Sequence, residues 1–342
     1  MDLLSNQIQW RSQKERQRRI MRIMVAIVAL ILLVVVVVWF WLTQPLLLSI
    51  TSKPQPSVDS SILKAHVQKL SVDLSPRDER HIENLDRTAD YIKGEFRSFG
   101  ATVSEQAFRV EGRSFRNVIA TFGPDTAERV VVGAHYDVAG PYPGADDNAS
   151  GIAGLIELGR LLSKQELKTR VELVAFTLEE PPFFRTTGMG SAVHAQSLKK
   201  AGVKVRVMFS LEMIGYFSDR AASQGFPAAI LKLFYPSRGN FIAVVGRTSE
   251  GLWVRRAKRS MREASTLPVY SISAPSFIPG IDFSDQLNYW NVGYSAVMIT
   301  DTAFYRNPNY HTENDTAEKL DYTKMAMVVQ GVFASVIDIA NS

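Results

Sequence analysis

The sequence predicts an α/β domain with a mixed, largely parallel central sheet and helices on both faces, preceded by one N-terminal transmembrane helix. Two observations lead to this fold class. Short runs of β-branched residues alternate with helical patterns along most of the 342 residues, as in sheets whose parallel strands are joined by helices. Near the N-terminus, one uncharged apolar run is long enough to cross a bilayer.

The transmembrane helix is predicted over residues 23–42, which are uncharged and almost wholly apolar. A helix of this length extends over about 30 Å, the thickness of the hydrocarbon core of a bilayer. Basic residues cluster between Arg11 and Arg22, and the next one is Lys53. The positive-inside rule therefore places residues 1–22 in the cytoplasm and the rest outside, facing the periplasm or the exterior from a bacterial inner membrane.

A cleaved signal peptide is the alternative for this segment. Its apolar stretch would be about 7–15 residues long and would end at a small-x-small cleavage site. Residues 23–42 are longer, and the Thr-Gln-Pro that follows offers no such site. We therefore expect an uncleaved signal anchor, a linker at residues 43–60 and one folded domain at residues 61–342.

Most of the net charge of +5 belongs to the anchor, because residues 1–42 carry +4 and the rest of the chain carries +1. No basic stripe with interleaved aromatic residues follows, so nucleic-acid binding is not expected. The chain has no cysteine, which excludes disulfides, cysteine nucleophiles and thiolate zinc ligands. A metal site would have to use His, Asp and Glu.

Six strands and five helices are predicted in the domain. The strands cover residues 117–122, 129–135, 170–176, 205–210, 241–245 and 294–300, and the helices cover residues 85–99, 150–164, 190–201, 250–265 and 317–340. Ligand sites of such sheets form at the carboxyl ends of the strands. Each candidate side chain is therefore judged by whether it follows a strand.

The first candidates follow the strand at residues 129–135. A lone histidine such as His135 is more often structural, but Asp137 stands where it could accept the second ring N–H, as carboxylates beside zinc-bound histidines do. Asp147 lies in a turn at the entrance of the next helix. It is either part of an N-capped turn or a carboxylate that faces the same crevice as His135.

Carboxylates also follow the next two strands. Glu179 and Glu180 come directly after the strand at residues 170–176. Because neighbouring side chains of a strand point in opposite directions, we expect one of them to bind metal and the other to act as a base. Glu212 follows the strand at residues 205–210 in apolar surroundings, where a carboxylate needs a cation or a hydrogen-bond donor.

Two histidines follow strands: His135, and His311, which stands beside Tyr310 after the strand at residues 294–300. The other three lie in polar helical patterns and are interpreted as solvated or structural: His66, His81 and His194. Two histidines with several carboxylates at one sheet edge fit two divalent ions bridged by a carboxylate. An aspartic protease dyad leaves the histidines unexplained, and a serine nucleophile lacks its Gly-x-Ser-x-Gly turn.

The motifs GAHYD, GADDNASG, LEEP with the later GMGSA, LEMIG, SDQLNYW and YHTENDT occur in this order. They resemble those of the M28 family of zinc peptidases, the relatives of bacterial leucyl aminopeptidases, over residues 85–340. The resemblance implies a zinc aminopeptidase-like fold with two zinc ions per chain, although Mn or Co could occupy such ligands. It implies that Asp147 bridges the ions, with His135 and Glu212 completing one site and Glu180 and His311 the other.

The resemblance also implies catalytic roles. Glu179 would be the general base that takes a proton from the attacking water and passes it to the leaving amine. Asp137 would orient His135, and Tyr310 would hydrogen-bond the oxyanion, as in some members. A cis peptide bond is expected between Asp147 and Asn148.

The expected function is a zinc-dependent exopeptidase that hydrolyses N-terminal residues of peptides. A glutaminyl cyclase, which resembles this family but works with one zinc, and a non-catalytic binding ectodomain are the alternatives. The complete set of five ligands favours two metals and hydrolysis. The preferred side chain, the amino- or carboxypeptidase direction and the oligomeric state stay open.

Four features differ from the family pattern or lie outside it. Glu212 stands where many aminopeptidases of the family have aspartate. Residues 181–187 lengthen the connection to GMGSA and are expected to form a wall of the pocket. Residues 216–239 have no counterpart and are interpreted as a lid or a membrane-proximal surface. Arg306 is interpreted either as a partner of a substrate carboxylate or as a surface arginine.

Overall fold

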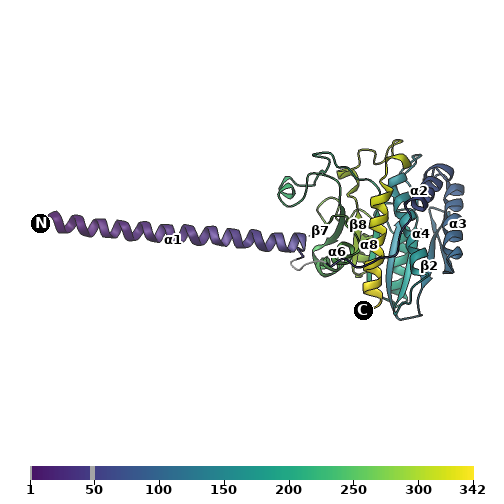
Figure 1. Ribbon diagram of the computed structural model, residues 1–342, viewed down its shortest axis with the longest axis horizontal. Helices are drawn as coiled ribbons and strands as arrows, with labels where there is room; N and C mark the ends of the chain where they lie inside the picture. Colours follow the sequence, from purple (N-terminus) through teal and green to yellow (C-terminus); the bar gives the residue numbers. More distant parts are fainter. Residues whose placement is uncertain (1, 47–50) are drawn as a thin grey trace.

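The computed structural model describes residues 2–46 and 51–342 (Figure 1). A long N-terminal helix, α1 (Asp2–Thr43), projects from an α/β domain. The domain is built on one eight-stranded sheet in the order β1-β2-β4-β3-β5-β8-β6-β7. The strands are β1 (Thr102–Val110), β2 (Arg113–Phe122), β3 (Glu128–His135), β4 (Arg170–Phe176), β5 (Lys204–Glu212), β6 (Ile242–Arg247), β7 (Val269–Ala274) and β8 (Ala296–Thr300).

The sheet is mixed, and its centre is parallel. β4, β3, β5 and β8 are neighbours and run in one direction. β2 is antiparallel to both β1 and β4, and β6 is antiparallel to β8 but parallel to β7. The predicted fold class is confirmed, and the carboxyl ends of the four central strands lie at one edge of the sheet.

Helices cover both faces of the sheet. One face packs the larger apolar core under α2 (Ser60–Gln68), α3 (Ile82–Ser98), α4 (Gly151–Leu162), α6 (Gly251–Ala264) and α8 (Tyr322–Ala340). The other face packs a smaller core under α5 (Gly190–Lys200) and α7 (Gln286–Asn291). The central strands are buried on both faces, which explains why their sequences are almost continuous apolar runs.

Among the described strands and α-helices, β1, β7, α2 and α7 were not predicted. β1 and β7 are the two edges of the sheet, and β1 alternates between half-buried and exposed residues, so it lacks the apolar run of a central strand. α2 begins after Asp59, whose carboxylate accepts the N–H of Ser61. The last helix begins at Tyr322 rather than at residue 317, because Asp321 accepts the N–H of Lys324 and so caps the helix at that point.

Among the described residues, two helices are long and apolar enough to cross a membrane. In α8 the apolar window is 61% buried, so this helix belongs to the core of the domain. In α1 the window within Gln9–Thr43 is not buried at all. The helix α1 is therefore the candidate membrane anchor.

Candidate metal centre

The predicted site residues lie together at the carboxyl edge of the central strands. His135 is the last residue of β3, and Glu212 is the last residue of β5. Asp147 belongs to the turn Ala145–Ser150 that leads into α4. His311 comes from the long loop after β8. Three parts of the chain, at and after the ends of β3, β5 and β8, thus deliver side chains to one crevice, as expected for a parallel sheet.

Glu179 and Glu180 reach the crevice in a different way from the one predicted. β4 ends at Phe176, and the chain turns at Leu178, whose φ is 59°. The pair therefore lies outside the strand, and the alternation of strand side chains does not govern it. Both carboxylates are nevertheless buried in the site, Glu180 beside His311 and Glu179 nearer to His135.

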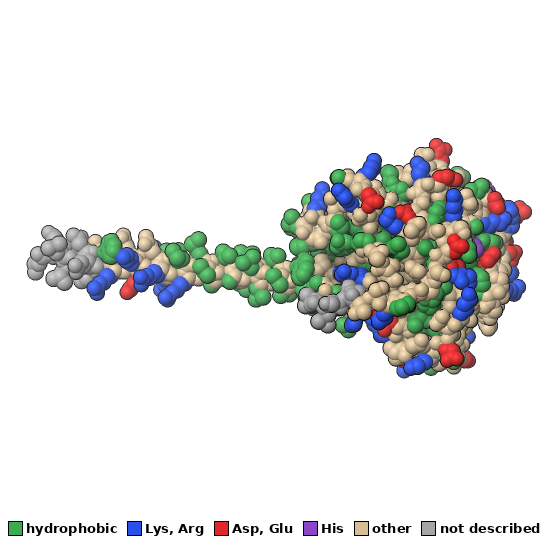
Figure 2. All heavy atoms as spheres, viewed as in Figure 1, with side chains coloured by type: hydrophobic (Ala, Val, Ile, Leu, Met, Phe, Trp, Pro, Cys, Tyr) green, Lys and Arg blue, Asp and Glu red, His purple; other side chains and the backbone are tan. Residues whose placement is uncertain are grey.

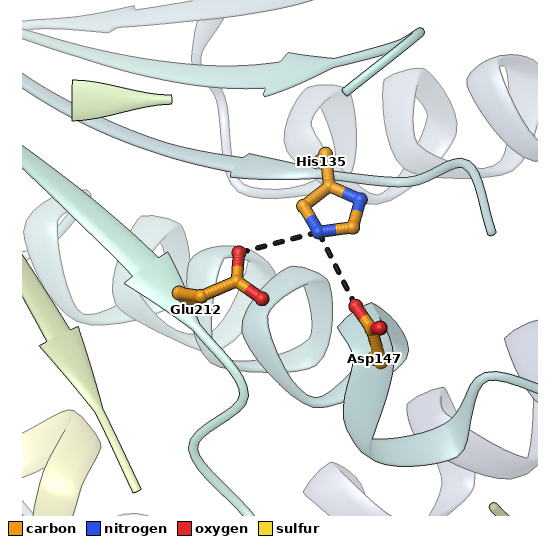
Figure 3. A group of neighbouring side chains, drawn as sticks. All are labelled: His135, Asp147 and Glu212. Atoms are coloured by element: carbon orange, nitrogen blue, oxygen red, sulfur yellow. Dashed lines mark ion pairs between the residues drawn. The ribbon is translucent and has the colours of Figure 1, made fainter. Parts of the chain in front are cut away.

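The first candidate ligand group consists of His135, Asp147 and Glu212 (Figure 3). The Nε2 atom of His135 lies 3.4 Å from Oδ1 of Asp147 and 3.3 Å from Oε2 of Glu212. All three side chains are buried and point toward one another.

The second group consists of Asp147, Glu180 and His311. The Nε2 atom of His311 lies 3.1 Å from Oδ2 of Asp147 and 3.2 Å from Oε2 of Glu180. Asp147 therefore turns one carboxylate oxygen toward each histidine. The peptide bond between Asp147 and Asn148 is cis, as predicted.

Several atoms of these groups lack a hydrogen-bond partner although they are buried. They are Nε2 of His135, Nε2 of His311, Oδ2 of Asp147 and Oε1 of Glu180. Unpaired polar atoms are unfavourable inside a protein, whereas a cation between them would satisfy nitrogen and oxygen together. Imidazole and carboxylate are donors that zinc accepts readily, so the residues fit the metal.

The electrostatics of the cluster also favour a cation. Burial raises the pKa of Glu212 and raises the pKa of Glu180 to about 8. Burial opposes the protonation of His311, but hydrogen bonds to Asp147 and Glu180 outweigh it and raise the pKa of His311 to about 10. Without a metal, the carboxyl and imidazole groups of the cluster hold protons tightly. Divalent ions would replace the positive charge of these protons.

Glu179 is buried close to both groups. Its Oε2 atom lies 4.0 Å from Nε2 of His135, farther than the oxygens of Asp147 and Glu212. It also belongs to a third set of atoms spaced closely enough for a metal, with His135 and Glu180. Burial raises the pKa of Glu179 well above its usual range, which is the property expected of a carboxyl group that accepts and returns a proton near neutral pH.

Asp137 supports the site through two kinds of bond. The Nδ1 atom of His135 lies 3.2 Å from the main-chain oxygen of Asp137 and 3.6 Å from its carboxylate. The hydrogen bond to the ring therefore involves the main chain rather than the expected carboxylate. The carboxylate instead accepts the N–H groups of Glu179 and Glu180 at 3.2 and 3.1 Å. One residue thus orients His135 and fixes the backbone of the glutamate pair.

Sequence reasoning did not find two further supporting residues. Ser284 donates to Oε2 of Glu212 at 2.7 Å, and Asp315 accepts the N–H groups of Asp146 and Asp147. Both belong to motifs noted in the sequence, SDQLNYW and YHTENDT. No rule about strand ends could assign them, because their partners come from distant parts of the chain.

The remaining histidines lie outside the site. Nδ1 of His66 pairs with the hydroxyl of Tyr91, and Nδ1 of His194 pairs with that of Tyr289. His81 is partly exposed and pairs with Asp78. The prediction that these three histidines are structural or solvated is consistent with these contacts.

An apolar cavity lies beside the candidate metal centre, and Glu212 and Tyr310 line it. Its walls come from β6, β7 and β8, from the loops at residues 279–283 and 302–305, and from residues 224–235. Tyr310 stacks on the ring of His311, with 3.7 Å between the ring centroids and 18° between the planes. The cavity therefore opens next to the groups that would hold metal.

The segments that depart from the family pattern surround this cavity. Residues 216–239 form one of its walls. Within residues 181–187, Phe184 packs edge-on against Phe283, which lines the cavity. This segment therefore supports the wall from behind rather than lining the cavity itself.

Arg306 is 5% exposed, so its interpretation as a surface arginine is wrong. Its guanidinium donates to the side chain of Gln224 and to the main-chain oxygens of Tyr216 and Phe241. It also lies 4.5 Å from the ring centroid of Phe241. Arg306 therefore fastens residues 216–239 to the domain.

Comparison with known proteins identifies relatives over most of the chain. The chain is 48% identical to Escherichia coli protein YfbL, and the match covers 84% of the chain and 91% of that protein. Leucine aminopeptidase 1 of Metarhizium robertsii is 24% identical, with 79% of this chain and 67% of that protein covered.

Solved structures share the fold. A zinc aminopeptidase from Bacillus subtilis gives a TM-score of 0.68 at 15% identity and covers 85% of this chain and 97% of that one. A glutaminyl cyclase from Bacteroides thetaiotaomicron gives a TM-score of 0.62 at 18% identity and covers 83% of this chain and 99% of that one.

The sequence model described as Peptidase family M28 matches residues 117–336. This range extends from β2 into α8, and it includes every side chain of the two candidate ligand groups. Because the match spans more than half of the sequence, the chain belongs to peptidase family M28, a family of hydrolases that cleave peptides.

Proposed function

We propose that the chain is an aminopeptidase that holds two zinc ions, one in each of the two ligand groups. The observation that carries the proposal is the position of Asp147. Its two carboxylate oxygens face His135 and His311 separately, and a further glutamate completes each group. Two ions bound there would lower the pKa of a water molecule and polarise the scissile carbonyl.

In this proposal Glu179 is the general base. It takes a proton from the attacking water and returns it to the amine that leaves. Its burial and its raised pKa support this role, since the carboxylate must hold the proton between the two steps. Tyr310, held against His311, donates a hydrogen bond to the oxyanion of the tetrahedral intermediate.

The proposed direction follows from the charges around the site. Glu212 is the one acidic residue among the described residues that line the cavity, and none of them is Lys or Arg. Arg306, the nearest candidate for binding a substrate carboxylate, is engaged with the cavity wall. No cationic side chain of the described cavity lining is therefore placed to pair with a C-terminal carboxylate, and we propose that the free N-terminus of the peptide is recognised instead.

The preferred first residue of the peptide follows from the cavity. Its lining is mostly apolar and aromatic, including Phe226, Phe241, Tyr270 and Phe283. A large apolar side chain at the N-terminus of the peptide would leave water on entering this space. We therefore propose leucine-like or aromatic first residues as the favoured substrates.

The test uses the full chain in detergent, stripped of metal and then supplied with zinc. Its substrates are a leucine-first tripeptide and the same peptide with an acetylated N-terminus. Zinc-dependent release of leucine from the free peptide alone supports the proposal. Release from neither peptide despite bound zinc refutes it, and cyclisation of a glutamine-first peptide would then indicate the glutaminyl cyclase alternative, while its absence would indicate a binding ectodomain.

We also propose that α1 is an uncleaved anchor that holds the domain on the outer side of the membrane. The support is the exposed apolar surface of α1 and the basic cluster before it. The peptide substrates would then be those of the periplasm or the exterior.

A further inference from the structure

The end of α1 is attached to the domain by specific contacts. Lys258 Nζ donates to the main-chain oxygens of Thr43 and Gln44 at 2.8 and 3.3 Å, and Ser271 Oγ donates to that of Thr43 at 2.7 Å. The guanidinium of Arg255 lies 5.6 Å from the ring centroid of Phe40. These contacts bring α6 and β7 against the last turn of the apolar helix.

This attachment determines where α6 lies relative to a membrane. Phe40 belongs to the apolar run, and Trp39 and Trp41 flank it at the end where indoles favour the membrane interface. A guanidinium in contact with Phe40 must then lie near the level of the lipid headgroups. At that depth, phosphate is the natural partner of an arginine.

The outward face of α6 is basic along its length. Leu252, Arg255, Arg259 and Arg262 follow one another at spacings of three, four and three residues, so they share one face of the helix. Leu252 is 84% exposed, and the side chain of Arg259 is 65% exposed. The opposite face, with Val254, Ala257 and Met261, is buried in the core.

Carboxylates neutralise only part of this charge. Glu263, the single acidic residue of α6, pairs with both Arg259 and Lys53. Across the described residues, no ion pair is found for Arg255 or Arg262. Burial, and to a smaller extent the charges of Arg262 and Arg255, lowers the pKa of Lys258 to about 8.

An apolar tip accompanies the basic face. The loop that carries the short helix η3 (Ala229–Leu233), drawn in green, projects from the side of the domain that α1 joins (Figure 1). Ile230 is 59% exposed and Leu233 is 75% exposed at this tip. Figure 2 shows hydrophobic, Lys and Arg side chains around the junction of the helix with the domain. An apolar tip and arginines without a carboxylate partner, both on the side of the domain that α1 joins, are the composition of a membrane-interface surface.

We propose that the α6–η3 surface (Leu252, Arg255, Arg259, Arg262, Ile230 and Leu233) lies on the bilayer that holds α1 and binds anionic phospholipid headgroups. This inference rests on the proposed anchoring by α1. The arginines bind lipid phosphate, while Leu252 and the η3 tip enter the interface. Because Leu231 of η3 and Phe226 line the cavity beside the metal centre, the active site is then held at the membrane surface.

The test uses the full chain in lipid nanodiscs made of phosphatidylcholine alone or with one quarter phosphatidylglycerol. The chain has no cysteine, so Leu233→Cys and Leu252→Cys each accept a single spin label. Val72→Cys, an exposed position on the turn after α2, is the control. We expect the labels at positions 233 and 252 to become accessible to oxygen and protected from an aqueous quencher in the anionic discs, while position 72 stays aqueous. Aqueous behaviour at all three positions would overturn the proposal.

A second arm tests the headgroup charge. Arg255→Gln with Arg262→Gln should weaken lipid contact in anionic discs by roughly thirty-fold, because each arginine near an anionic surface contributes about fivefold. Arg87→Gln with Arg97→Gln, two exposed arginines of α3, should change nothing. Equal contact in both lipids, or equal loss in both variants, would refute anionic lipid binding. Co-elution of the chain with the discs reports anchoring by α1 separately, so failure of the anchor and failure of the surface are distinguishable.

Discussion

Asp147 is the residue on which the candidate centre depends. It faces one histidine with each oxygen, and its own backbone N–H is held by Asp315. Glu179 lies beside these groups, but its carboxylate is farther from His135 than that of Glu212 is, and Glu180 is the glutamate beside His311. This difference in position separates a residue that would bind metal from one that would move a proton.

Glu179→Gln tests this separation. Glutamine preserves the shape of the side chain but cannot carry a proton, so turnover should fall by about 10³-fold while two zinc ions stay bound. Glu180→Gln is the matched control one residue away, and it should lower the zinc content. Activity with saturating zinc and metal content by elemental analysis are measured together. If Glu179→Gln loses metal and activity in equal proportion, Glu179 is a ligand and the role as base is wrong.

The expectation that ligands follow the carboxyl ends of strands predicted the positions of some side chains better than those of others. His135 and Glu212 are the last residues of their strands, so a sheet of known direction is sufficient to bring them together. The position of Glu179 and Glu180 depends on a backbone turn at Leu178, and no periodicity in the sequence encodes that turn. Ser284 and Asp315 depend on contacts across more than 70 and 160 residues, which only the folded chain reveals.

Among the elements, the segment between β5 and β6 forms a wall of the proposed substrate pocket. Residues 216–239 form a cavity wall, although η3 is their only regular structure. They are fastened by Arg306 and by the hydroxyl of Tyr235, which donates to the main-chain oxygen of Ser271 on β7. Sequence patterns predict helices and strands. Residues 216–239 are held mainly by side-chain hydrogen bonds, so the sequence could mark them as unusual but could not predict their position in the fold. The edge strands β1 and β7 were missed because edges carry no apolar run.

Ala243→Phe tests the cavity as the pocket for the first side chain. Ala243 lines the cavity from β6, together with Phe241 and Val245 on the same face of the strand. A phenyl group there should fill the space, lowering kcat/KM for leucine-first peptides by about 10–100-fold with little change for alanine-first peptides. Ala107→Phe, at an exposed position of β1, controls for the substitution itself. An equal fall for both peptides would show that the cavity does not select the first residue.

At the scale of the whole molecule, the anchor and the domain differ in composition. The exposed apolar surface belongs mainly to α1, and most of the net charge precedes its apolar run. The α/β class of the domain was predicted from its alternating strand and helix patterns alone, without use of the α1 segment. The orientation of the anchor, by contrast, is a property of the chain in a membrane and is argued only from charge.

Cysteine labelling tests the orientation. In intact spheroplasts of a bacterial host, an impermeant maleimide should react with the Val72→Cys variant of the domain and not with the Gln17→Cys variant of the tail. Permeabilisation should expose both positions, and the full-length mass should show that α1 is retained. The reverse labelling pattern would place the domain in the cytoplasm and contradict the proposed substrates. A shortened product would indicate a cleaved signal peptide.

The order of the ligands along the chain has a consequence for synthesis. The group of His135, Asp147 and Glu212 is complete once residue 212 has been made, but the second group waits for His311, near the end of the 342 residues. Asp315, which holds the backbone at Asp146 and Asp147, is made later still. If the domain is exported as proposed, a chain that leaves the ribosome N-terminus first would begin its export without the second group. The order of the sequence delays the assembly of the proposed protease until His311 and Asp315 have been made.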